Sequence, residues 1–290
     1  MFLKVEGENE NYSEITPAFS KKKRLKIGTF KVVSNGLRIG ERFLKIVFDN
    51  AKQYKVDEIY VTIFDNRQEL LSLTFLLEKF GFKYYGEKIS QSGTEKVYVR
   101  DFAKNSDDTN PRLSFPWLSK TSDVYVIPIK PEYHTELLPD SILRTESPDD
   151  FVDNEPYRNA ISKAYVSHSQ TRNLNSGDII VFYRSGGIYK GVATTIGIVE
   201  NVIKPETLDE LIRVCRKRTV LSQNELKEYW ERFPANKPFV INFLYAFSFI
   251  KRMTLKEMLD NAILPNMETV KTITKIERKA LIQLITSSGI

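Results

Sequence analysis

Residues 32–44, VVSNGLRIGERFL, decide the fold of the first part of the chain. The apolar residues that lead into this stretch predict a strand, and apolar residues at helical spacing after it predict a helix that begins at Ile39. The first amides of a helix have no partner within it and carry partial positive charge. We therefore expect an anion site suited to a pyrophosphate, where Gly40 lets the phosphate approach and Arg38 and Arg42 add cationic donors. The alternative for this stretch alone is a plain strand, turn and helix with a packing glycine.

Short strands alternate with helices around this stretch. The near-continuous apolar run 58–64 is typical of a strand buried on both faces. The start of the chain predicts one hairpin, formed by Phe2–Val5 and Ile15–Phe19. The other predicted strands are 26–33, 82–86 and 96–102, and the predicted helices are 39–51 and 67–80.

Four features in this order resemble the C-terminal half of the GNAT N-acetyltransferase family. The turn 35–40 (NGLRIG) resembles the family's acetyl-CoA signature, Arg/Gln-x-x-Gly-x-Gly/Ala, and the strand 60–64 stands where its central strand would be. Asp65-Asn66 matches the asparagine region after that strand, and 77–82 (LEKFGF) matches the ending Tyr-Glu-Lys-Leu-Gly-Phe. The resemblance implies a truncated mixed sheet with helices, acetyl-CoA as cofactor, and cofactor contacts from Val32, Val33, Arg38, Ile39, Gly40, Glu41, Arg42 and Asn66.

Three departures from the family pattern bear on catalysis. Arg38 occupies the position of the first motif glycine, and Asn35 replaces the Arg or Gln. Leu77 stands where many family members place a tyrosine as general acid, and leucine cannot donate a proton. Only residues 1–25 precede the signature strand, so the helices that usually close the acceptor site are missing. We therefore assign no catalytic residue, and the acceptor and the retention of acetyl transfer stay open.

Residues 104–122 are rich in Asn, Asp, Ser and Pro, and they predict a linker between a first domain, 1–103, and a second domain, 123–290. The second domain combines many short strands with few helices and a Gly-Asp turn. This combination favours a small β-barrel with appended helices, which places the whole chain in the α+β class. The predicted strands include 124–129, 179–184, 191–202 and 239–247, and the predicted helices are 207–217, 223–232, 255–261 and 275–286.

Basic and aromatic residues are interleaved in the second domain. This combination suits nucleic acid, because arginine holds phosphate while aromatic rings stack on bases. Serine and histidine side chains can add hydrogen bonds to a base edge or a phosphate. The alternative is a barrel with an ordinary charged surface. The predicted nucleic-acid-binding residues are Ser167, His168, Ser169, Tyr183, Arg184, Arg216 and Arg218.

Two segments of this domain resemble the PUA-like superfamily, near its ASCH and EVE branches. In residues 163–167 followed by 174–183, a Gly-Asp turn precedes an apolar strand that ends in Phe-Tyr. Residues 195–200 match the next strand of the barrel. The resemblance implies a pocket for RNA or a modified base. No complete aromatic cage can be identified in the sequence, so the recognition of a modified base stays open.

The composition excludes several kinds of site. The chain has 290 residues, a net charge of +6, one cysteine and two histidines. The charge favours an anionic partner such as nucleic acid or a phosphorylated cofactor. A lone cysteine cannot form an intrachain disulfide, and two distant histidines argue against a metal site. Without a signal-peptide pattern or a membrane-length apolar run, we expect no membrane segment and a cytoplasmic location.

These observations leave two main hypotheses of function. The first is a GNAT-like, acetyl-CoA-dependent N-acetyltransferase with an RNA-binding PUA-like domain, acting on or guided by RNA. The second is a non-catalytic protein that binds nucleic acid or senses a ligand through a degenerate GNAT fold. A homodimer in which a partner subunit completes the acceptor site is a third alternative. The basic run 21–24 favours a solvated loop, with a phosphate or nucleic-acid contact as the alternative.

Overall fold

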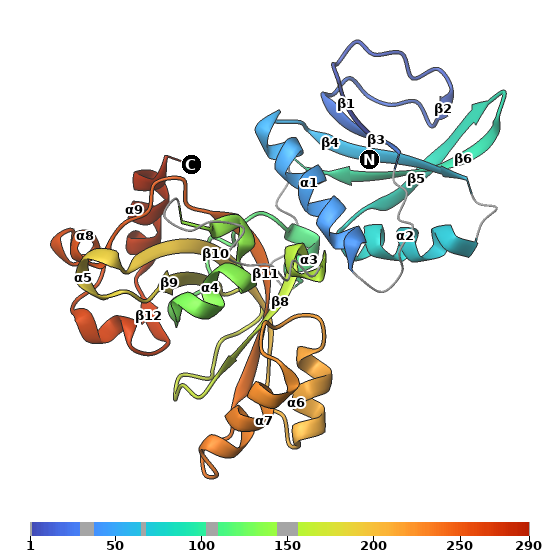
Figure 1. The fold of residues 1–290 in the computed structure, drawn as a ribbon. Coiled ribbons are helices and arrows are strands. Elements are labelled where there is room, and N and C mark those ends of the chain that lie inside the picture. The colour runs from blue at the N-terminus through green and yellow to red at the C-terminus, as the bar shows by residue number, and fades with distance from the viewer. Residues whose placement is uncertain (1, 30–37, 65–67, 103–109, 144–155, 290) are drawn as a thin grey trace. The chain divides into compact units, whose positions relative to one another are not determined.

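The computed structural model describes residues 2–29, 38–64, 68–102, 110–143 and 156–289. The chain divides into two compact units. The first comprises Met1–Asp107 and Arg112–Pro116, and the second comprises Asp108–Pro111 and Trp117–Ile290. Each unit contains a six-stranded sheet of its own with both parallel and antiparallel neighbours (Figure 1). The predicted α+β class is therefore confirmed.

The sheet of the first unit is built around two parallel strands, β3 (Arg24–Thr29) and β4 (Glu58–Phe64). They are joined by helix α1 (Ile39–Gln53), which begins at the predicted residue and buries an apolar face against the sheet. The strand order is β1-β3-β4-β6-β5-β2. The remaining elements of this unit are β1 (Phe2–Glu6), β2 (Ile15–Thr16), α2 (Gln68–Lys79), β5 (Lys83–Ser90) and β6 (Gly93–Asp101).

The predicted hairpin of Phe2–Val5 with Ile15–Phe19 is wrong. Strand β1 pairs with β3 at one edge of the sheet, whereas β2 pairs with β5 at the opposite edge. Residues 7–14 therefore cross from one edge to the other. The residue pattern predicts that the two segments are extended, but it does not say which strands they pair with, because pairing depends on contacts with distant residues.

The segment after β6 packs into the first unit. A single helical turn, α3 (Pro111–Ser114), leads to Phe115, which is 1% exposed. The Phe115 ring contacts the rings of Phe48 and Phe80, with centroids 5.3 Å and 5.9 Å away. The buried guanidinium of Arg100 donates to the backbone carbonyls of Phe80 and Phe115. Residues that the sequence assigns to a linker thus complete the core of this unit.

The sheet of the second unit has the order β12-β7-β9-β10-β11-β8, and within it only β7 and β9 are parallel neighbours among the described strands. Its strands are β7 (Val124–Ile129), β8 (Ser162–Ser167), β9 (Ile179–Arg184), β10 (Val192–Ile203), β11 (Phe239–Ser248) and β12 (Thr274–Ile276). Its helices are α4 (Pro131–Leu137), α5 (Gly187–Lys190), α6 (Leu208–Cys215), α7 (Gln223–Arg232), α8 (Leu255–Asp260) and α9 (Arg278–Ser288), with 3-10 turns at Pro139–Ser141, Pro156–Asn159 and Met267–Val270.

This second sheet curls on itself. Buried side chains of β7, β9 and β11 share one apolar cluster, although two strands separate β7 from β11. On the edge strand β8, the hydroxyl of Tyr165 donates to the backbone carbonyl of Pro128 on β7, 2.6 Å away. The sheet therefore approaches a barrel whose seam is bridged by a side chain, since the described strands β8 and β7 form no backbone ladder. In the described ranges, no helix is both long and apolar enough to cross a lipid bilayer.

Candidate nucleic-acid interface

A cavity of about 150 Å³ lies at the seam of the second sheet. Three short stretches of main chain border it: 128–130 at the end of β7, 164–166 in β8, and 219–221 between α6 and α7. Tyr133 and Leu137 of α4 and Tyr229 of α7 complete the lining. The end of β7 pairs with β9 on one side, but among the described strands β12 pairs on the other side only with Val124–Val126, which leaves that side of 127–129 open toward the seam.

Three tyrosines from three different elements line this cavity. Tyr165 reaches it from β8 and is held by its hydrogen bond to the Pro128 carbonyl. Tyr133 of α4 donates its hydroxyl to Oε1 of Glu225, 3.2 Å away. Aromatic rings with hydroxyls that already have partners offer apolar faces to a ligand. The remaining lining is mostly aliphatic, so the site suits a flat, largely uncharged group.

The carboxylate of Glu225 stabilises one wall of the cavity. Burial would raise the pKa of Glu225, but hydrogen bonds from the Ser222 amide, the Ser222 hydroxyl and Tyr133 outweigh this and lower it. The same residues, Ser222 and Glu225, form a capping box that begins α7. Burial, followed by the nearby Tyr229 and Glu225, raises the pKa of Tyr133 to about 12. Tyr133 is therefore a protonated donor at neutral pH, and Glu225 is its charged acceptor.

Three of the predicted nucleic-acid-binding residues lie beside this cavity. His168 stacks on the ring of Tyr229, and Ser167 directly follows the lining residue Val166. Arg218 directly precedes the lining residue Thr219, and its guanidinium lies 3.9 Å from the carboxylate of Glu200. Positions 167–168 and 218, which are far apart in the sequence, thus adjoin lining residues of the same cavity.

The other four predicted residues do not line the cavity. The hydroxyl of Ser169 contacts that of Thr272 at 2.8 Å. Tyr183 is buried, with its hydroxyl 3.4 Å from the Gly187 carbonyl. The remaining two are Arg184, half-buried at the end of β9, and Arg216, exposed after α6.

Sequence reasoning missed the three tyrosines of the cavity. Tyr133, Tyr165 and Tyr229 come from a helix after β7, an edge strand and a helix before β11, and no spacing rule connects them. Each looks like an ordinary apolar position of its own element. Only the curl of the sheet brings them together, so no signal in the sequence could have identified the group.

The lone cysteine is not part of any reactive site. Cys215 is 1% exposed and packs in an apolar cluster at the end of α6. Burial raises the pKa of its thiol to about 12, so it is protonated and inert at neutral pH. Among the described residues, no three His, Cys, Asp or Glu side chains gather to hold a metal ion.

The predicted cofactor turn is described from Arg38 onward, while Val32, Val33 and Asn66 lie outside the described residues. Arg38 has a left-handed backbone with a φ of 54°, the conformation that favours the glycine of the family motif. Its guanidinium lies 2.5 Å from Oε1 of Glu41. A Cβ at Gly40 would lie 2.6 Å from Cδ2 of Leu76, so Gly40 allows α1 to pack against α2. Ile39 and Arg42 belong to the first turn of α1, half-buried and exposed respectively.

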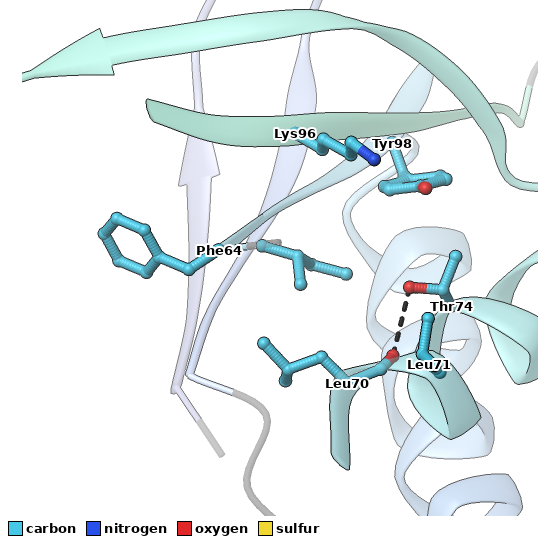
Figure 2. Close-up of a pocket in the computed structure, with 7 residues that line it drawn as sticks. Phe64, Leu70, Leu71, Thr74, Lys96 and Tyr98 are labelled. Atoms are coloured by element: carbon cyan, nitrogen blue, oxygen red, sulfur yellow. Dashed lines mark hydrogen bonds between the residues drawn. The ribbon is translucent and has the colours of Figure 1, made fainter. Parts of the chain in front are cut away.

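A second cavity lies at the end of β4, beside the start of α2 (Figure 2). It is lined by side chains such as Phe64, Thr74 and Tyr98, and the Thr74 hydroxyl donates to the Leu70 carbonyl at 3.1 Å. Its volume is about 10 Å³, which is room for one water molecule at most. In this form of the protein it cannot admit an acyl group.

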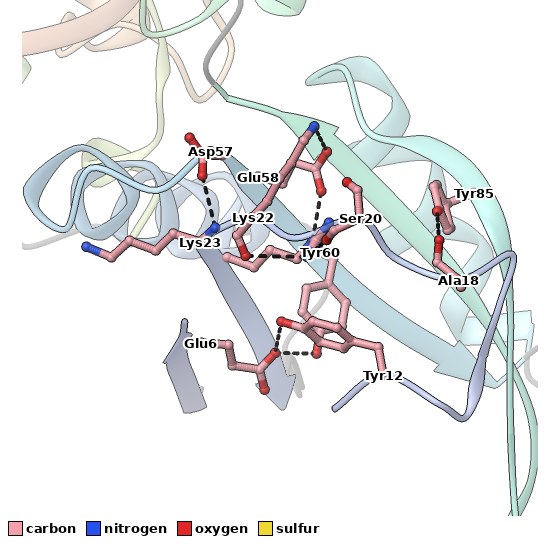
Figure 3. Close-up of polar contacts among 11 residues, drawn as sticks. Glu6, Tyr12, Ala18, Ser20, Lys22, Lys23, Asp57, Glu58, Tyr60 and Tyr85 are labelled. Carbon is pink, nitrogen blue, oxygen red and sulfur yellow. Dashed lines mark hydrogen bonds and ion pairs between the residues drawn. The ribbon is translucent and has the colours of Figure 1, made fainter. Parts of the chain in front are cut away.

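Residues of the basic run 21–24 form ion pairs and hydrogen bonds within the first unit (Figure 3). Arg24 is 1% exposed, and its Nε lies 2.8 Å from Oε2 of Glu58. Lys22 pairs with the same carboxylate, and the Lys23 amide donates to Asp57 at 2.9 Å. These contacts favour a structural role for the run over a nucleic-acid contact.

A buried carboxylate lies in the same region of the first unit. Glu6 is 2% exposed and accepts hydrogen bonds from the hydroxyls of Tyr60 at 2.7 Å and Tyr12 at 3.0 Å (Figure 3). Burial, followed by the hydrogen bond to Glu6, raises the pKa of Tyr60 far above its usual range. Tyr60 of β4 and Tyr12 of the segment 7–14 therefore act as fixed donors that tie both elements to Glu6 at the end of β1.

The chain matches no family model and no curated protein. It is similar to solved structures over a little more than half its length. A point mutant of an ASCH protein from Zymomonas mobilis has 12% identity and a TM-score of 0.41, covering 57% of this chain and 96% of its own. Human THYN1 in complex with DNA containing 5-methylcytosine has 13% identity and a TM-score of 0.36, covering 58% and 99%. These sequence identities and TM-scores are low. The ligand of the cavity therefore has to be inferred from the residues that line it.

Proposed function

We propose that the second unit binds single-stranded or unpaired nucleic acid and takes one base into the tyrosine-lined cavity. The observation that carries the proposal is the convergence of Tyr133, Tyr165 and Tyr229 on a space of about 150 Å³. A cavity of about this volume admits a single aromatic ring. Stacking of a base on an aromatic side chain contributes about 1–3 kcal/mol.

Cationic side chains near the cavity supply the phosphate contacts that this function needs. Lys130 lines the cavity and is exposed to solvent. The guanidinium of Arg232 lies 4.9 Å from the centre of the Tyr229 ring. Arg216 and Lys217 lie on the loop that leads through Arg218 to the cavity wall. Basic groups around an aromatic site hold the backbone of a strand while its base is stacked.

Fluorescence anisotropy with a labelled single-stranded RNA 12-mer tests this function. Replacing Tyr229 by Ala should weaken binding by the stacking contribution, about 1–3 kcal/mol. Tyr189→Ala is the matched control, because Tyr189 is 71% exposed on α5 and lines no part of the cavity. Equal affinity for an RNA 12-mer with and without bases would rule out a base site.

A second function, binding of acetyl-CoA by the first unit, is favoured by one separate observation. Among the described residues, Arg24–Ile27 of β3 pair with Glu58–Val61 of β4, and no pairing between these two strands is found for the rest of β3, up to Thr29, or of β4, up to Phe64. Where two parallel strands separate, an extended pantetheine arm can add to their free edges as a strand would. This supports the GNAT-like hypothesis, in which the amides that begin α1 would hold the pyrophosphate.

Calorimetry of the full chain with acetyl-CoA tests this second function. Arg42→Glu should weaken binding, because Arg42 is exposed in the first turn of α1. Lys83→Glu makes the same charge change on β5 and is the control. The absence of any binding heat would exclude the cofactor. Binding without transfer to RNA or protein amines would favour a ligand sensor.

A further inference from the structure

The main chain, rather than side chains alone, borders the cavity at the seam. Ala164, Tyr165 and Val166 are consecutive residues of β8, and all three line it. Alternate side chains of a strand point to opposite faces. Three consecutive residues can border the same space only when the edge of the strand faces it. The free edge of β8 is therefore part of the cavity wall.

The hydrogen bonds of β8 show which of its groups point into the seam. The Ala164 amide donates to the carbonyl of Arg218 at 2.8 Å, on the side away from β11. At the start of the strand the Ile161 carbonyl accepts from the Tyr245 amide at 2.8 Å, on the side of β11. Odd-numbered residues of β8 thus pair with β11, and even-numbered residues point outward.

Two outward-pointing backbone groups of β8 border the cavity and have no hydrogen-bond partner in the described protein. The carbonyl of Ala164 and the amide of Val166 lie side by side on the outer edge of β8, as an acceptor followed by a donor. Within the described ranges neither forms a hydrogen bond, since β11 lies on the other side and the loop 219–221 makes no backbone bond to either group. Unpaired main-chain groups that border a cavity require a partner from a ligand or from water.

We propose that the base in the cavity is held edge-on by β8, with its hydrogen-bonding edge paired to the Ala164 carbonyl and the Val166 amide. This inference rests on the function proposed above and adds the groups that recognise the base. The Watson–Crick edge of a nucleobase presents a donor next to an acceptor, which complements this pair. The tyrosine side chains contact the faces of the ring, so that its faces are recognised by side chains and its edge by the main chain.

The geometry favours a base over an extended peptide. An added peptide strand requires a continuous free edge several residues long. Here the Ala164 amide, at one end of the edge, already donates to the Arg218 carbonyl, and the next residues, 219–221, form another wall of the same cavity. The free part of the edge runs only from the Ala164 carbonyl to the amide and carbonyl of Val166, which matches the edge of a base and is too short for an added strand.

The test uses the full chain and labelled single-stranded RNA 12-mers with one variable central residue. Each of the four bases is tried, and the tightest is then compared with its edge-methylated form (N1 of a purine, N3 of a pyrimidine) and with an abasic residue. On the protein side, Val166 is replaced by the corresponding α-hydroxy acid, which replaces its amide N–H by an ester oxygen and keeps the side chain. The same replacement at Tyr165, whose amide points to β11, is the control.

We expect edge methylation and the Val166 ester each to weaken binding of the base-containing RNA about tenfold, as the loss of one buried hydrogen bond would. The abasic RNA should not respond to the Val166 ester. If neither change affects affinity while the abasic RNA still binds more weakly, a base enters but β8 does not read it, and this inference is wrong. If base-containing and abasic RNA bind equally, the proposed function fails as well.

Discussion

The ring of His168 stacks on the ring of Tyr229, with centroids 5.6 Å apart and planes inclined by 19°. Nδ1 of His168 lies 2.9 Å from the carbonyl of Asn236, and the Asn236 side-chain amide donates to the His168 carbonyl at 2.8 Å. Because a carbonyl only accepts, Nδ1 carries the proton. The loop after β8 and the loop before β11 therefore fix the His168 ring, against which the cavity-lining ring of Tyr229 packs.

His168 is expected to act as a positioning residue for Tyr229. His168→Ala should weaken RNA binding about 2- to 13-fold, since an aromatic pair contributes about 0.5–1.5 kcal/mol. His168→Phe keeps the stack and should restore most of the affinity, although it loses the bond to Asn236. Anisotropy with the RNA 12-mer measures both variants. Equal losses in the Ala and Phe variants would show that the stack is not what matters.

Glu225 should make the stability of the protein depend on pH. Its pKa is lowered in the folded state, so its stabilising contribution is present above the unfolded value of 4.5 and is lost as the pH falls through the folded pKa. Glu225→Gln should therefore reduce stability at pH 7 and flatten the loss of stability in acid. Urea unfolding at several pH values measures this. Glu228→Gln, an exposed change on the same helix, should leave the profile as it is in the parent protein.

The sequence predicts elements well where one pattern dominates. The apolar run 58–64 and the turn before 179–184 give β4 and β9 with the predicted bounds. Pairing partners are harder to predict, as the hairpin of 2–5 with 15–19 shows. The two-residue strand β2 carries no periodic pattern, and its partner β5 is separated from it by more than 65 residues of chain. The pairing of β2 with β5 depends on the packing of the whole first unit and not on a local pattern.

The candidate site was predictable only in part, for a similar reason. His168 and Arg218 stand out in the sequence by their chemistry, and both lie beside the cavity. Tyr133 and Tyr229 do not stand out, because tyrosine in a helix is usually a packing residue. The main-chain groups of Ala164 and Val166 leave no trace in the sequence at all. Their availability follows from the seam of the sheet, which is a property of the whole second unit.

Arg24 should be required for the stability of the first unit and not for nucleic-acid binding. Its guanidinium is buried between Glu58 and the ring of Phe19, whose centre is 4.1 Å from Cζ. Removing one partner of a buried ion pair costs about 3–5 kcal/mol, so Arg24→Ala should lower the free energy of unfolding by about that amount. Chemical denaturation of the parent protein and of Arg24→Ala measures the difference in the free energy of unfolding.

The neighbouring lysine separates the two interpretations of the basic run. Lys21 is exposed and can be changed without disturbing the ion pair of Arg24. Lys21→Glu should leave RNA affinity and its salt dependence unchanged if the run is structural. A smaller salt dependence in this variant would instead show that the run contacts nucleic acid, because each lost phosphate contact reduces the slope of log affinity against log salt concentration.

Lys55 should be replaceable by glycine with a gain in stability. Helix α1 ends in a pair of bonds typical of a glycine cap: the Val56 amide donates to the Ala51 carbonyl at 3.2 Å, and the Lys55 amide to the Lys52 carbonyl at 3.1 Å. Lys55 has a φ of 49°, which is costly for a residue with a Cβ.

The strain at this position exceeds what glycine loses in the unfolded chain. A left-handed backbone costs a non-glycine residue about 1–2 kcal/mol, and glycine's extra freedom when unfolded offsets about 0.5–1 kcal/mol of the relief. Lys55→Gly should thus raise the free energy of unfolding by about 0.5–1 kcal/mol. The matched change Lys52→Gly, inside the last turn of α1, should lower it by about 0.5–1 kcal/mol. Thermal unfolding of both variants decides the matter: if both are destabilised, the end of α1 does not adopt this cap in solution.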